Sequence, residues 1–588
     1  TNLVATDQMV DSPTNNFATM NPLQNYYNNA NFSEGNLKII DDGGEYVYNT
    51  STIGMSSGKW YWEVYDLEES NYDLIGITAA YPVSTTEYLA RLDTSWAYYS
   101  HSGNVLNNDN NTGSGVAYGA TYGDGDIIGV ALDLENNKIY WSKNGTWQDS
   151  GDPTSGATGT GAISITALSS AFGMGHYLAA SGDWNDSASD VMKAVYNFGQ
   201  DSSFAGNETA QGNADGNGVG DFYYTPPSGY LALCTSNLST PAIKLPGEHF
   251  NTVLYTGDGT VSRAITGVGF TPDMAVAKAR NTTGQFMTVD SVRGMGSAQM
   301  KRLVWNAPYA SQNATTNEWT SLDSDGFTFS NTAGSGYSDL NIDTTTYVTW
   351  SWLAAAANAS NEDGSTTSII RANTTAGFSI VSYTGTGSVA TVGHGLSQKP
   401  DLIIVKGLES SLNWPVYQSP QGATYAVWLD ESNASNSSGS TGYWNDTEPT
   451  ASVFTVGDSS QTGGLTEDYI AYCFHSVEGY SKVGSYEGNN NADGTFVYCG
   501  FKPAFLMVKD MDSGQQWGLE DNARNSYNIV NKILYPNLTA AEDTDDIYGV
   551  DFVSNGFKWR GANATVNYTE TYLFYAIAES PFKYANAR

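Results

Sequence analysis

The chain has 588 residues, too many for one hydrophobic core, and its length suggests about four folding units of roughly 150 residues each. It carries 61 acidic and 25 basic side chains, and the resulting formal net charge of −36 argues against nucleic acid and anionic lipid surfaces as partners. The sequence contains no run of about 18 apolar residues, so membrane insertion is not expected.

Aromatic residues make up 13% of the chain and glycine occurs 62 times, which favours short strands joined by tight turns. Only 15% of residues are charged, so the acidity reflects scarce Lys and Arg and is typical of a protein kept soluble in an ion-rich medium. Cys234, Cys473 and Cys499 lie in apolar stretches without C-x-x-C spacing. Small buried thiols are expected, with a Cys473–Cys499 disulfide as the alternative.

Residues 1–30 are polar and rich in asparagine, and we expect an extended lead-in that runs along a surface. The first residue is Thr and not Met, which suggests processing or a longer chain. Strands follow the lead-in: in "GKWYWEVYDL", Trp60 and Trp62 fall on one face of a strand. "DIIGVALDL" and "KIYWSKNGTW" then form the arms of a hairpin whose turn contains Asn136 and Asn137.

Four segments follow one another in the order and approximate spacing of the SPRY domain: "SSGKWYWEVY", "IGI", "GDIIGVALDLENNKIYWSKNG" and "AVYNFGQ". Residues 31–240 therefore resemble that family. The resemblance implies a concanavalin A-like sandwich of two sheets, which binds partners through its loops and carries out no chemistry of its own.

One pattern then occurs three times. Each copy opens with a strand and a turn ("FNTVLYTGDGT", "FSIVSYTGTGS", "YSKVGSYEGNN"), continues with a strand after a proline ("TPDMAVAKA", "KPDLIIVKG", "KPAFLMVKD"), and closes with a strand ("TYVTWSWLAA", "DYIAYCFHSV", "TYLFYAIAES"). Each proline is expected at the first residue of its strand. The predicted modules span residues 241–365, 366–478 and 479–588, with a linker, "ANASNEDGSTTS", near the first boundary.

The predicted fold class is therefore all-β: a concanavalin A-like (SPRY) sandwich followed by three tandem small β-sandwich modules. The closing strands alternate aromatic and small side chains, as expected where one sheet packs on another. We expect the four modules to form four separate cores in series.

Two sequence motifs suggest hydrolysis, and neither is well supported. "GMSSG" fits the formula of a nucleophile elbow, but a strand follows where a helix is required. "WEVYDLEES" places Glu63 and Asp66 on one strand, in the manner of glycosidases with this type of sandwich. A separation of three residues directs the two carboxylates to opposite faces, so a solvated strand end is the favoured interpretation.

An acid and a base recur three residues apart in two of the copies. Asp290 and Arg293 lie in "DSVRG", and Asp521 and Arg524 lie in "DNARN", while the middle copy has "YQSPQG" at this place. A local ion pair that holds a loop is favoured over a ligand site.

The stretch "GNADGNGVGD" offers oxygen ligands in a glycine-rich turn. Asp215, Asn217 and Asp221 together would suit a structural calcium ion, although the spacing of an EF-hand is missing. A flexible loop that leads to the last strand of the SPRY-like domain is the favoured interpretation, and the calcium site is the alternative. No other cofactor is expected.

Aromatic side chains in polar loops are the candidate ligand contacts, because aromatic faces suit the apolar sides of sugars and neighbouring Asp and Asn can bond hydroxyls. Core packing is the favoured interpretation for each of them, and ligand contact is the alternative. The candidates are Trp147, Trp184, Trp414, Tyr443 and Trp444.

Several stretches resemble bacteriophage tail-fibre or virion surface proteins, especially those of marine phages: "DQMVDSPTNNFATMNPL", "GDFYYTPPSGYLALCTSNL" and the run "PDLIIVKG … VFTVG … YIAYCFHSVEGYSKVGSY". The resemblance implies a non-catalytic appendage on the virion surface, outside the host cell. It would contact other virion proteins, form a homotrimer, and bind a host-surface glycan or protein through loop tips whose repetition strengthens attachment.

Three other classes of protein stay open. A purely structural capsid decoration or fibre protein needs the same stable sandwiches. A polysaccharide depolymerase needs a pair of catalytic carboxylates. A cellular SPRY adaptor usually adds RING-type cysteines or coiled-coil heptads, and this sequence has neither.

Overall fold

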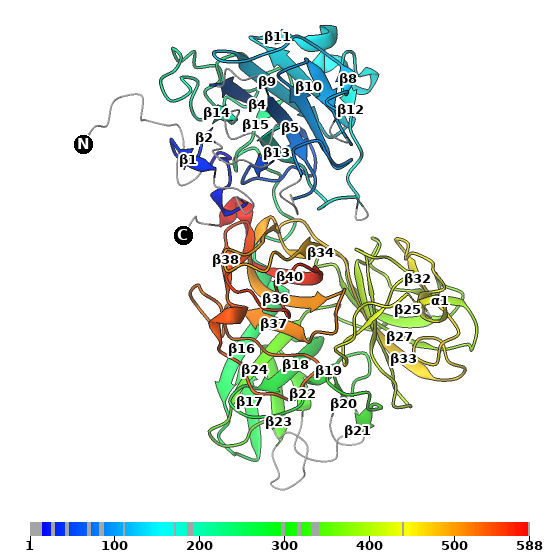
Figure 1. The fold of residues 1–588 in the computed structure, drawn as a ribbon. Helices are drawn as coiled ribbons and strands as arrows, with labels where there is room; N and C mark the ends of the chain where they lie inside the picture. Colours follow the sequence, from blue (N-terminus) through cyan, green and yellow to red (C-terminus); the bar gives the residue numbers. More distant parts are fainter. Residues whose placement is uncertain are drawn as a thin grey trace. The chain divides into compact units, whose positions relative to one another are not determined.

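The computed structural model describes residues 15–24, 30–40, 46, 48–67, 72–81, 87–109, 112–169, 172–184, 192–295, 300–313, 319–330, 340–437 and 440–585. The chain divides into two compact units, Thr1–Thr240 and Pro241–Arg588, and both are built almost entirely of strands (Figure 1). The all-β prediction is therefore confirmed. Among the described residues, no helix combines the length and the apolar character that a membrane span requires.

The predicted lead-in, residues 1–30, lies mostly outside the described residues, and its described part is folded into the first unit. Phe17 forms an isolated antiparallel bridge with Cys234, and Met20 forms one with Ser51. The side chains of Phe17 and Met20 are buried. This part of the lead-in is therefore integral to the first unit and does not run along its surface, because burial of its large apolar side chains stabilises the packed position.

The first unit contains two sheets. The larger sheet has the order β1-β2-β14-β4-β9-β10-β11, with β12 beside β10 and β15 parallel to β4, and the smaller has the order β3-β13-β5-β6-β7-β8. The larger sheet consists of β1 (Asn31–Ser33), β2 (Lys38–Ile40), β4 (Lys59–Asp66), β9 (Ile127–Asp133), β10 (Lys138–Lys143), β11 (Thr146–Trp147), β12 (Ile163–Ser164), β14 (Lys193–Asn197) and β15 (Leu231–Ala232). The smaller consists of β3 (Tyr48–Thr50), β5 (Asp73–Thr78), β6 (Ser95–Tyr99), β7 (Asn104–Leu106), β8 (Val116–Ala117) and β13 (Leu178–Asp183).

Large aromatic side chains fill the space around these sheets. Trp60, Tyr61 and Trp62 on β4 are all buried, so both faces of this strand are covered. The indole of Trp141 on β10 donates a hydrogen bond of 2.9 Å to the carbonyl of Ile75 on β5, which joins the larger sheet to the smaller one. The predicted hairpin is present as β9 and β10. The 3-10 helices described in this unit are η2 (Pro22–Gln24), η3 (Gln148–Ser150) and η4 (Pro153–Thr158).

The second unit contains three sandwiches, which we call the first (residues 250–352), the second (359–474) and the third (481–581). In Figure 1 they are coloured green, yellow, and orange to red. The larger sheet of each contains four strands in one recurring order: β16-β24-β18-β19, β27-β33-β29-β30 and β34-β40-β36-β37. In the smaller sheet of each, the strand that follows β16, β27 or β34 along the chain (β17, β28 or β35) pairs antiparallel with a later strand.

The strands of the first sandwich are β16 (Phe250–Thr256), β17 (Ser262–Thr266), β18 (Met274–Ala279), β19 (Met287–Asp290), β20 (Lys301–Val304), β21 (Gln312–Asn313), β22 (Trp319–Asp323), β23 (Gly326–Ser330) and β24 (Thr346–Trp352). Those of the second are β25 (Ala359–Asn361), β26 (Ser368–Asn373), β27 (Phe378–Thr384), β28 (Ala390–Gly393), β29 (Leu402–Gly407), β30 (Pro415–Gln418), β31 (Val427–Trp428), β32 (Val453–Val456) and β33 (Asp468–Phe474), with the helix α1 (Ser440–Trp444).

The strands of the third sandwich are β34 (Ser481–Glu487), β35 (Phe496–Tyr498), β36 (Phe501–Asp510), β37 (Trp517–Asp521), β38 (Val550–Val553), β39 (Gly556–Trp559) and β40 (Thr571–Pro581). The 3-10 helices described in the second unit are η5 (Pro246–Glu248), η6 (Asp546–Tyr548) and η7 (Phe582–Tyr584).

Two details differ from the sequence predictions. β25 lies inside the predicted linker and pairs with β26, because a polar segment can still form a solvent-facing edge strand. The prolines are not first residues of strands: Pro272 and Pro400 precede β18 and β29 by two residues, and Pro503 lies within β36 at a shift in register. Such an irregularity accommodates the missing N–H of proline.

Each sandwich closes a core of its own between its two sheets, and a further core is shared by all three. The alternation of each closing strand explains this arrangement. On β24, for example, Tyr347 faces the core of the first sandwich while Trp350 enters the shared core. The expectation of four separate cores in series was therefore wrong for this unit. The largest members of the shared core are its tryptophans, Trp305, Trp350, Trp352, Trp414 and Trp517.

Candidate functional site

Two of the five predicted aromatic contact residues are buried, which contradicts a ligand-binding role for them. Trp414 is 0% exposed and Trp444 is 1% exposed. The indole N–H of Trp414 donates to the carbonyls of Val304 and Ala307 at 3.1 and 3.2 Å, and Trp444 packs edge-on against Tyr417. Core packing prevails because an indole in a polar stretch of sequence can still point inward from its turn.

The other three candidates, Trp147, Trp184 and Tyr443, are partly exposed. Trp147 packs edge-on against Tyr61, with ring centroids 6.4 Å apart. Tyr443 belongs to the second unit and Trp147 and Trp184 to the first, where they pack in different clusters. These side chains are therefore separate candidates and do not form one described site.

Trp184 is held in position by a buried carboxylate. Its indole N–H donates to Oδ2 of Asp109 at 3.2 Å, and the same oxygen accepts from the hydroxyl of Tyr88 at 2.8 Å and the backbone N–H of Gly113 at 3.0 Å. Burial alone would raise the pKa of Asp109, but hydrogen bonds from Thr112 and these groups outweigh it, so the pKa is lowered. The carboxylate is thus ionised and anchors a half-buried indole.

The geometry does not support the predicted calcium site. Oδ1 of Asp215 accepts the backbone N–H groups of Asn217 and Val219 at 2.8 and 3.0 Å, and its Oδ2 accepts from Nδ2 of Asn237 at 2.7 Å. Asp221 also accepts a backbone N–H, at 3.1 Å. These oxygens organise the loop itself. In the part of the chain that the structure describes, no group of three His, Cys, Asp or Glu side chains could hold a metal ion.

Glu63 has a structural role that the sequence analysis missed. It is fully buried on β4, and its two oxygens accept the backbone N–H groups of Tyr223 and Tyr224 at 2.8 and 2.7 Å. The hydroxyl of Tyr61 and Nδ2 of Asn197 donate to it as well, at 3.0 and 3.2 Å. Burial raises its pKa to about 7 although these hydrogen bonds lower it. The prediction of a solvated strand end was wrong. The aromatic residues on both sides of the acid in "YWEVY" were the feature of the sequence that could have indicated its burial.

Replacing Glu63 with glutamine should free the segment that it holds. The amide oxygen of glutamine can still accept one of the two backbone N–H groups, but its amide nitrogen cannot accept the other, and an unpaired buried donor costs about 1–3 kcal/mol. We expect amide hydrogen exchange at Tyr223 and Tyr224 to accelerate by roughly 10-fold or more. Mass spectrometry of peptides that cover these residues measures this effect. Glu135→Gln, at a largely exposed carboxylate, is the control, and equal exchange in both variants would exclude the proposed role of Glu63.

The predicted local ion pairs are present, and they are buried. Nε of Arg293 lies 2.5 Å from Oδ2 of Asp290, and Nε of Arg524 lies 2.6 Å from Oδ2 of Asp521. All four side chains are almost inaccessible to solvent. The pairs therefore belong to the interior of the second unit.

The same aspartates contact neighbouring sandwiches. The hydroxyl of Tyr472 donates to Oδ2 of Asp290 at 2.8 Å, and the indole of Trp350 donates to Oδ2 of Asp521 at 3.1 Å. Gln418 occupies the corresponding place in the second sandwich, at the end of β30. Each aspartate thus satisfies a local arginine and a donor from another sandwich, which explains why the acid is buried at a junction.

A buried lysine near the end of β18, β29 or β36 extends from each sandwich into a neighbouring one. Burial lowers the pKa of each lysine to about 8. The second sandwich thereby contacts the first, the third contacts the second, and the first contacts the third, so the contacts close a ring. The amines donate to backbone carbonyls, from Lys278 to Thr539 at 3.2 Å, from Lys406 to Pro308 at 2.9 Å, and from Lys509 to Ser432 at 3.3 Å.

Backbone hydrogen bonds repeat the same ring. In each of these bonds, a backbone N–H of one sandwich donates to a backbone carbonyl of another sandwich. That carbonyl belongs to the residue two positions after the buried lysine. The three bonds are Ser311 to Leu408, Ser435 to Met511 and Glu542 to Arg280, each 2.8 Å long. The carboxylate of Glu542 also binds the guanidinium of Arg280, with two contacts of 3.0 Å. The junctions are therefore three equivalent contacts arranged cyclically.

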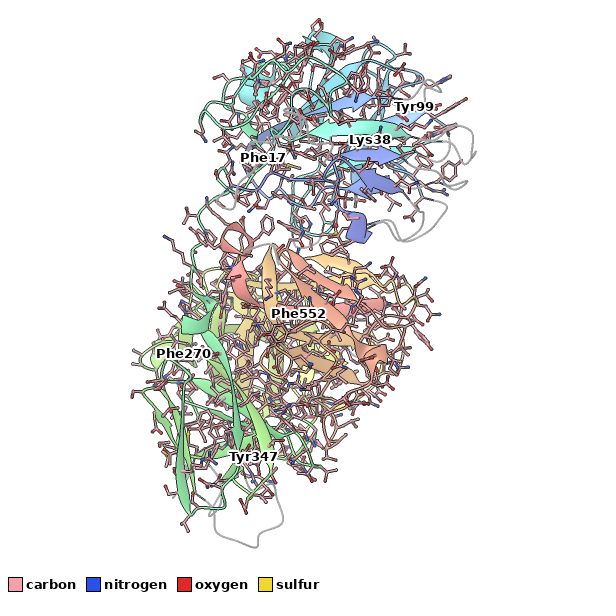
Figure 2. The ribbon with its side chains drawn as sticks, turned by 90° about the vertical axis from the view of Figure 1, so that its left-hand side faces the viewer. Phe17, Lys38, Tyr99, Phe270, Tyr347 and Phe552 are labelled. Carbon is pink, nitrogen blue, oxygen red and sulfur yellow. The ribbon has the colours of Figure 1, made fainter. Side chains whose placement is uncertain are left out.

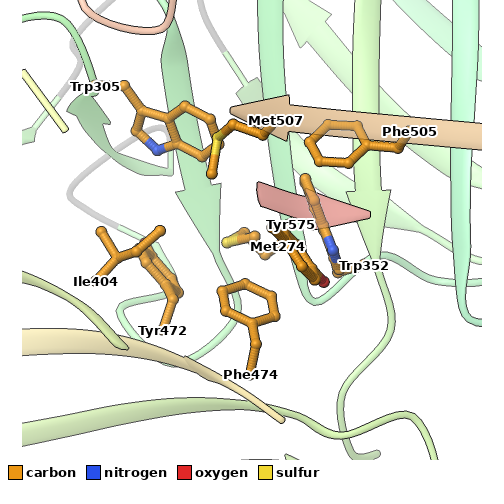
Figure 3. Close-up of a pocket in the computed structure, with 9 residues that line it drawn as sticks. All are labelled: Met274, Trp305, Trp352, Ile404, Tyr472, Phe474, Phe505, Met507 and Tyr575. Carbon is orange, nitrogen blue, oxygen red and sulfur yellow. The ribbon is translucent and has the colours of Figure 1, made fainter. Parts of the chain in front are cut away.

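A small apolar cavity lies where the three sandwiches meet (Figure 3). Its volume of about 10 Å³ leaves room for at most one water molecule, and the apolar lining offers such a water no partner. It is therefore a packing gap of the shared core and not a ligand pocket. Three residues from each sandwich line it: Met274, Trp305, Trp352, Ile404, Tyr472, Phe474, Phe505, Met507 and Tyr575.

Comparison with known families separates the two units. Residues 245–581, more than half of the chain, match the family described as "Domain of unknown function (DUF7483)". The chain belongs to the DUF7483 family. The DUF7483 match begins before the first sandwich and ends with the third, so it spans the ring of junctions. Residues 59–171 match the SPRY domain and lie in the first unit of this DUF7483 protein, which confirms that part of the SPRY prediction.

Solved SPRY domains resemble parts of the DUF7483 chain. The SPRY domain of human HERC1 is 18% identical, with a TM-score of 0.22, and the match covers 28% of this chain and 91% of that structure. A second human SPRY domain is 14% identical, with a TM-score of 0.21, and the match covers 28% of this chain and 93% of that structure. No curated protein matches the DUF7483 chain.

Proposed function

We propose that this DUF7483 protein is a non-catalytic appendage of a bacteriophage particle that stands on the virion surface and binds a host-surface glycan or protein. The observation that carries the proposal is the ring of three sandwiches around one core. An appendage must keep its shape outside the cell, and a closed ring of buried junctions resists local opening better than modules joined only by linkers. The resemblance of several sequence stretches to phage tail-fibre and virion surface proteins supports the same conclusion.

The first unit supplies the second argument. SPRY domains are generally non-catalytic interaction modules, and residues 59–171 match that domain. The indole of Trp184, fixed by Asp109, gives this unit a preorganised aromatic surface of the kind that contacts sugars or apolar protein groups. Trp147 is a second partly exposed aromatic contact in the same unit.

The polysaccharide depolymerase is the less favoured alternative. Its best carboxylate candidates, Glu63 and Asp66, are 0% and 1% exposed. The oxygens of Glu63 are occupied by backbone N–H groups, so this carboxylate is not placed to protonate a glycosidic oxygen or to attack a sugar. A structural decoration without receptor binding stays the principal alternative, because the ring of sandwiches would serve it equally well.

The partners follow from this role. The appendage would contact other virion proteins, and a homotrimer would raise the number of receptor contacts, since linked weak sites bind at a higher effective concentration. Nucleic acid is not a proposed partner, because the net charge of −36 opposes it.

Antibody labelling of intact particles tests the location. An antibody raised against residues 480–588 should decorate the outside of the particles in electron micrographs. Adsorption of the purified full chain to host cells then tests receptor binding, and we expect saturable binding that competes with intact particles. Particles that the antibody does not label would exclude the appendage, and labelled particles whose chain does not adsorb would favour the structural alternative.

A further inference from the structure

Each sandwich of the second unit holds one loop by a pair of stacked tyrosines, one on its opening strand and one on its closing strand. The pairs are Tyr255–Tyr347, Tyr383–Tyr469 and Tyr486–Tyr572, with ring centroids 4.9, 5.1 and 5.1 Å apart (Tyr347 is labelled in Figure 2). The first hydroxyl donates to the carbonyl of Leu340, Thr462 or Val566, at 2.9, 2.7 and 2.5 Å. The second hydroxyl accepts the N–H of Ile342, Gly464 or Tyr568, at 3.1, 2.8 and 2.9 Å.

A second loop lies against the first in every sandwich, and together they form what we call a tip: residues 257–261 with 341–345, 385–389 with 463–467, and 488–490 with 567–570. Backbone bonds join the two loops, from Gly259 to Asn341, from Gly387 to Gly463 and from Asn490 to Asn567, at 3.0, 2.8 and 2.8 Å.

A glycine allows the close approach of the two loops in each tip. A Cβ atom at Gly257, Gly385 or Gly488 would lie 1.9, 2.2 or 1.9 Å from the carbonyl oxygen of Ile342, Gly464 or Tyr568. No other residue fits at such distances. The three tips therefore have the same structure. In each, the stacked tyrosines hold one loop by hydrogen bonds, and backbone hydrogen bonds join that loop to the other.

These braced loops carry exposed apolar side chains. Ile342 is 42% exposed, Leu465 is 71% exposed and Tyr568 is 42% exposed. Val261 and Val389, on the partner loops of the first two tips, are 69% and 54% exposed. Rigid backbone under an exposed apolar group is typical of a contact residue, because little conformational entropy is then lost on binding.

Carboxylates flank the apolar groups. Asp343 in the first tip and Asp468 beside the second are exposed, and Glu570 lies in the third. Burial and the negative charges of Asp510 and Asp512 raise the pKa of Glu570, so this tip has an acidic surrounding. In the first tip Asp258 pairs with Arg263 at 3.4 Å, so part of the negative charge there is balanced. The tips therefore combine an apolar centre with acidic neighbours.

We propose that the three tips are contact sites for a protein surface that presents apolar side chains within a rim of lysine and arginine, and that one chain engages three such surfaces. The proposal rests on the attachment function above and selects a protein, not a glycan, as the class of receptor for this unit. At the first two tips Ile342 and Leu465 offer no ring face for a sugar, so only Tyr568 in the third tip could stack on one. The carboxylate neighbours of all three match basic side chains. A second copy of this chain is a poor occupant, because both copies would bring the same negative charge.

A short labelled peptide of leucine and lysine is the probe, and its binding to the full chain at physiological salt is measured by fluorescence anisotropy. The test variant combines Ile342→Ser, Leu465→Ser and Tyr568→Ser. The matched control combines Leu245→Ser, Met295→Ser and Tyr527→Ser, which removes apolar side chains that are 62%, 52% and 87% exposed outside the tips. Both variants keep the net charge, and thermal melting checks that both keep the fold.

We expect the unaltered chain and the control variant to bind equally, and the tip variant to bind on the order of tenfold more weakly. A peptide whose lysines are acetylated should also bind more weakly, because its side chains are neutral and cannot pair with the carboxylates of the tips. Equal binding of tip variant and control would overturn the proposal. So would retention of the chain on immobilised polysaccharide that the tip variant loses, since that result makes the tips glycan sites.

Adsorption to host cells separates this proposal from the function on which it rests. If the chain adsorbs to cells and the tip variant adsorbs equally well, the attachment function holds and the tips are not its contacts. If peptide binding depends on the tips and the chain adsorbs to no host cell, the tips are contact sites and attachment to the host is wrong.

Discussion

Replacing Trp414 with alanine is expected to destabilise the second unit by about 3–5 kcal/mol, the usual cost of truncating a large buried aromatic side chain. Trp414 lies directly before β30, fully buried in the shared core. The substitution opens a cavity there and also removes the donor for the carbonyls of Val304 and Ala307 in the first sandwich. Calorimetry of the full chain measures the loss, and hydrogen exchange of peptides from residues 302–308 locates it.

Trp414→Phe separates the two causes. Phe286 holds the corresponding place in the first sandwich, directly before β19, so a phenyl ring suits this position. The variant keeps most of the packing and loses the indole donor, a loss for which we expect about 1–3 kcal/mol. Trp147→Ala, at a partly exposed residue of the first unit, should leave the second unit unchanged. An unfolding transition of Trp414→Ala that coincides with that of the unaltered chain would show that this residue does not join the sandwiches.

Patterns with a period of two residues predicted the fold well. The alternation in "GKWYWEVYDL" and in the three closing strands follows from strand geometry, so it is readable without knowing which surface covers each face. The blocks that recur along the sequence correspond to strands that occupy the same places in the sheet order of the three sandwiches, because each block encodes one element. The spacing of Asp290 and Arg293 predicted their ion pair for the same reason, since both partners lie on one turn.

Contacts between distant parts of the chain were not readable in this way. "SLNWPVY" and "SGDWNDS" are equally polar, yet Trp414 is buried at a junction and Trp184 is partly exposed. Trp414 is buried because the first sandwich covers its indole, and the covering residues lie about a hundred positions away in the sequence. The buried lysines show the same limit, because "AVAKA", "IIVKG" and "LMVKD" read as strand ends where lysine would be solvated. A lysine repeated at one place in all three copies was the signal available.

The junction lysines should make stability depend on pH, and Lys406→Met isolates the contribution of one of them. Burial holds the pKa of Lys406 at about 8 in the folded chain, whereas its ordinary value is 10.5. Between these values the unfolded chain binds more protons than the folded chain, so the free energy of unfolding rises with pH in this window. Below pH 8 both states are protonated and the full cost of burying the charge is present. Across the window the unaltered chain should gain about 3 kcal/mol relative to Lys406→Met.

The comparison with the variant is essential because other buried groups titrate in the opposite direction. Burial raises the pKa of Cys473, and of tyrosines such as Tyr472, so the unfolded chain releases those protons first and stability falls at alkaline pH. These contributions are common to both proteins and cancel in the difference. Burial raises the pKa of Asp430, a charged group that faces Lys406, to about 6, so Asp430 is ionised throughout the window and does not alter its sign. Urea unfolding followed by tryptophan fluorescence at pH 7, 8, 9 and 10 supplies the difference. If the difference in unfolding free energy between the two proteins stays constant over this range, the amine of Lys406 is solvated. The ring of junctions would then lack the buried lysine charge on which its contacts with backbone carbonyls depend.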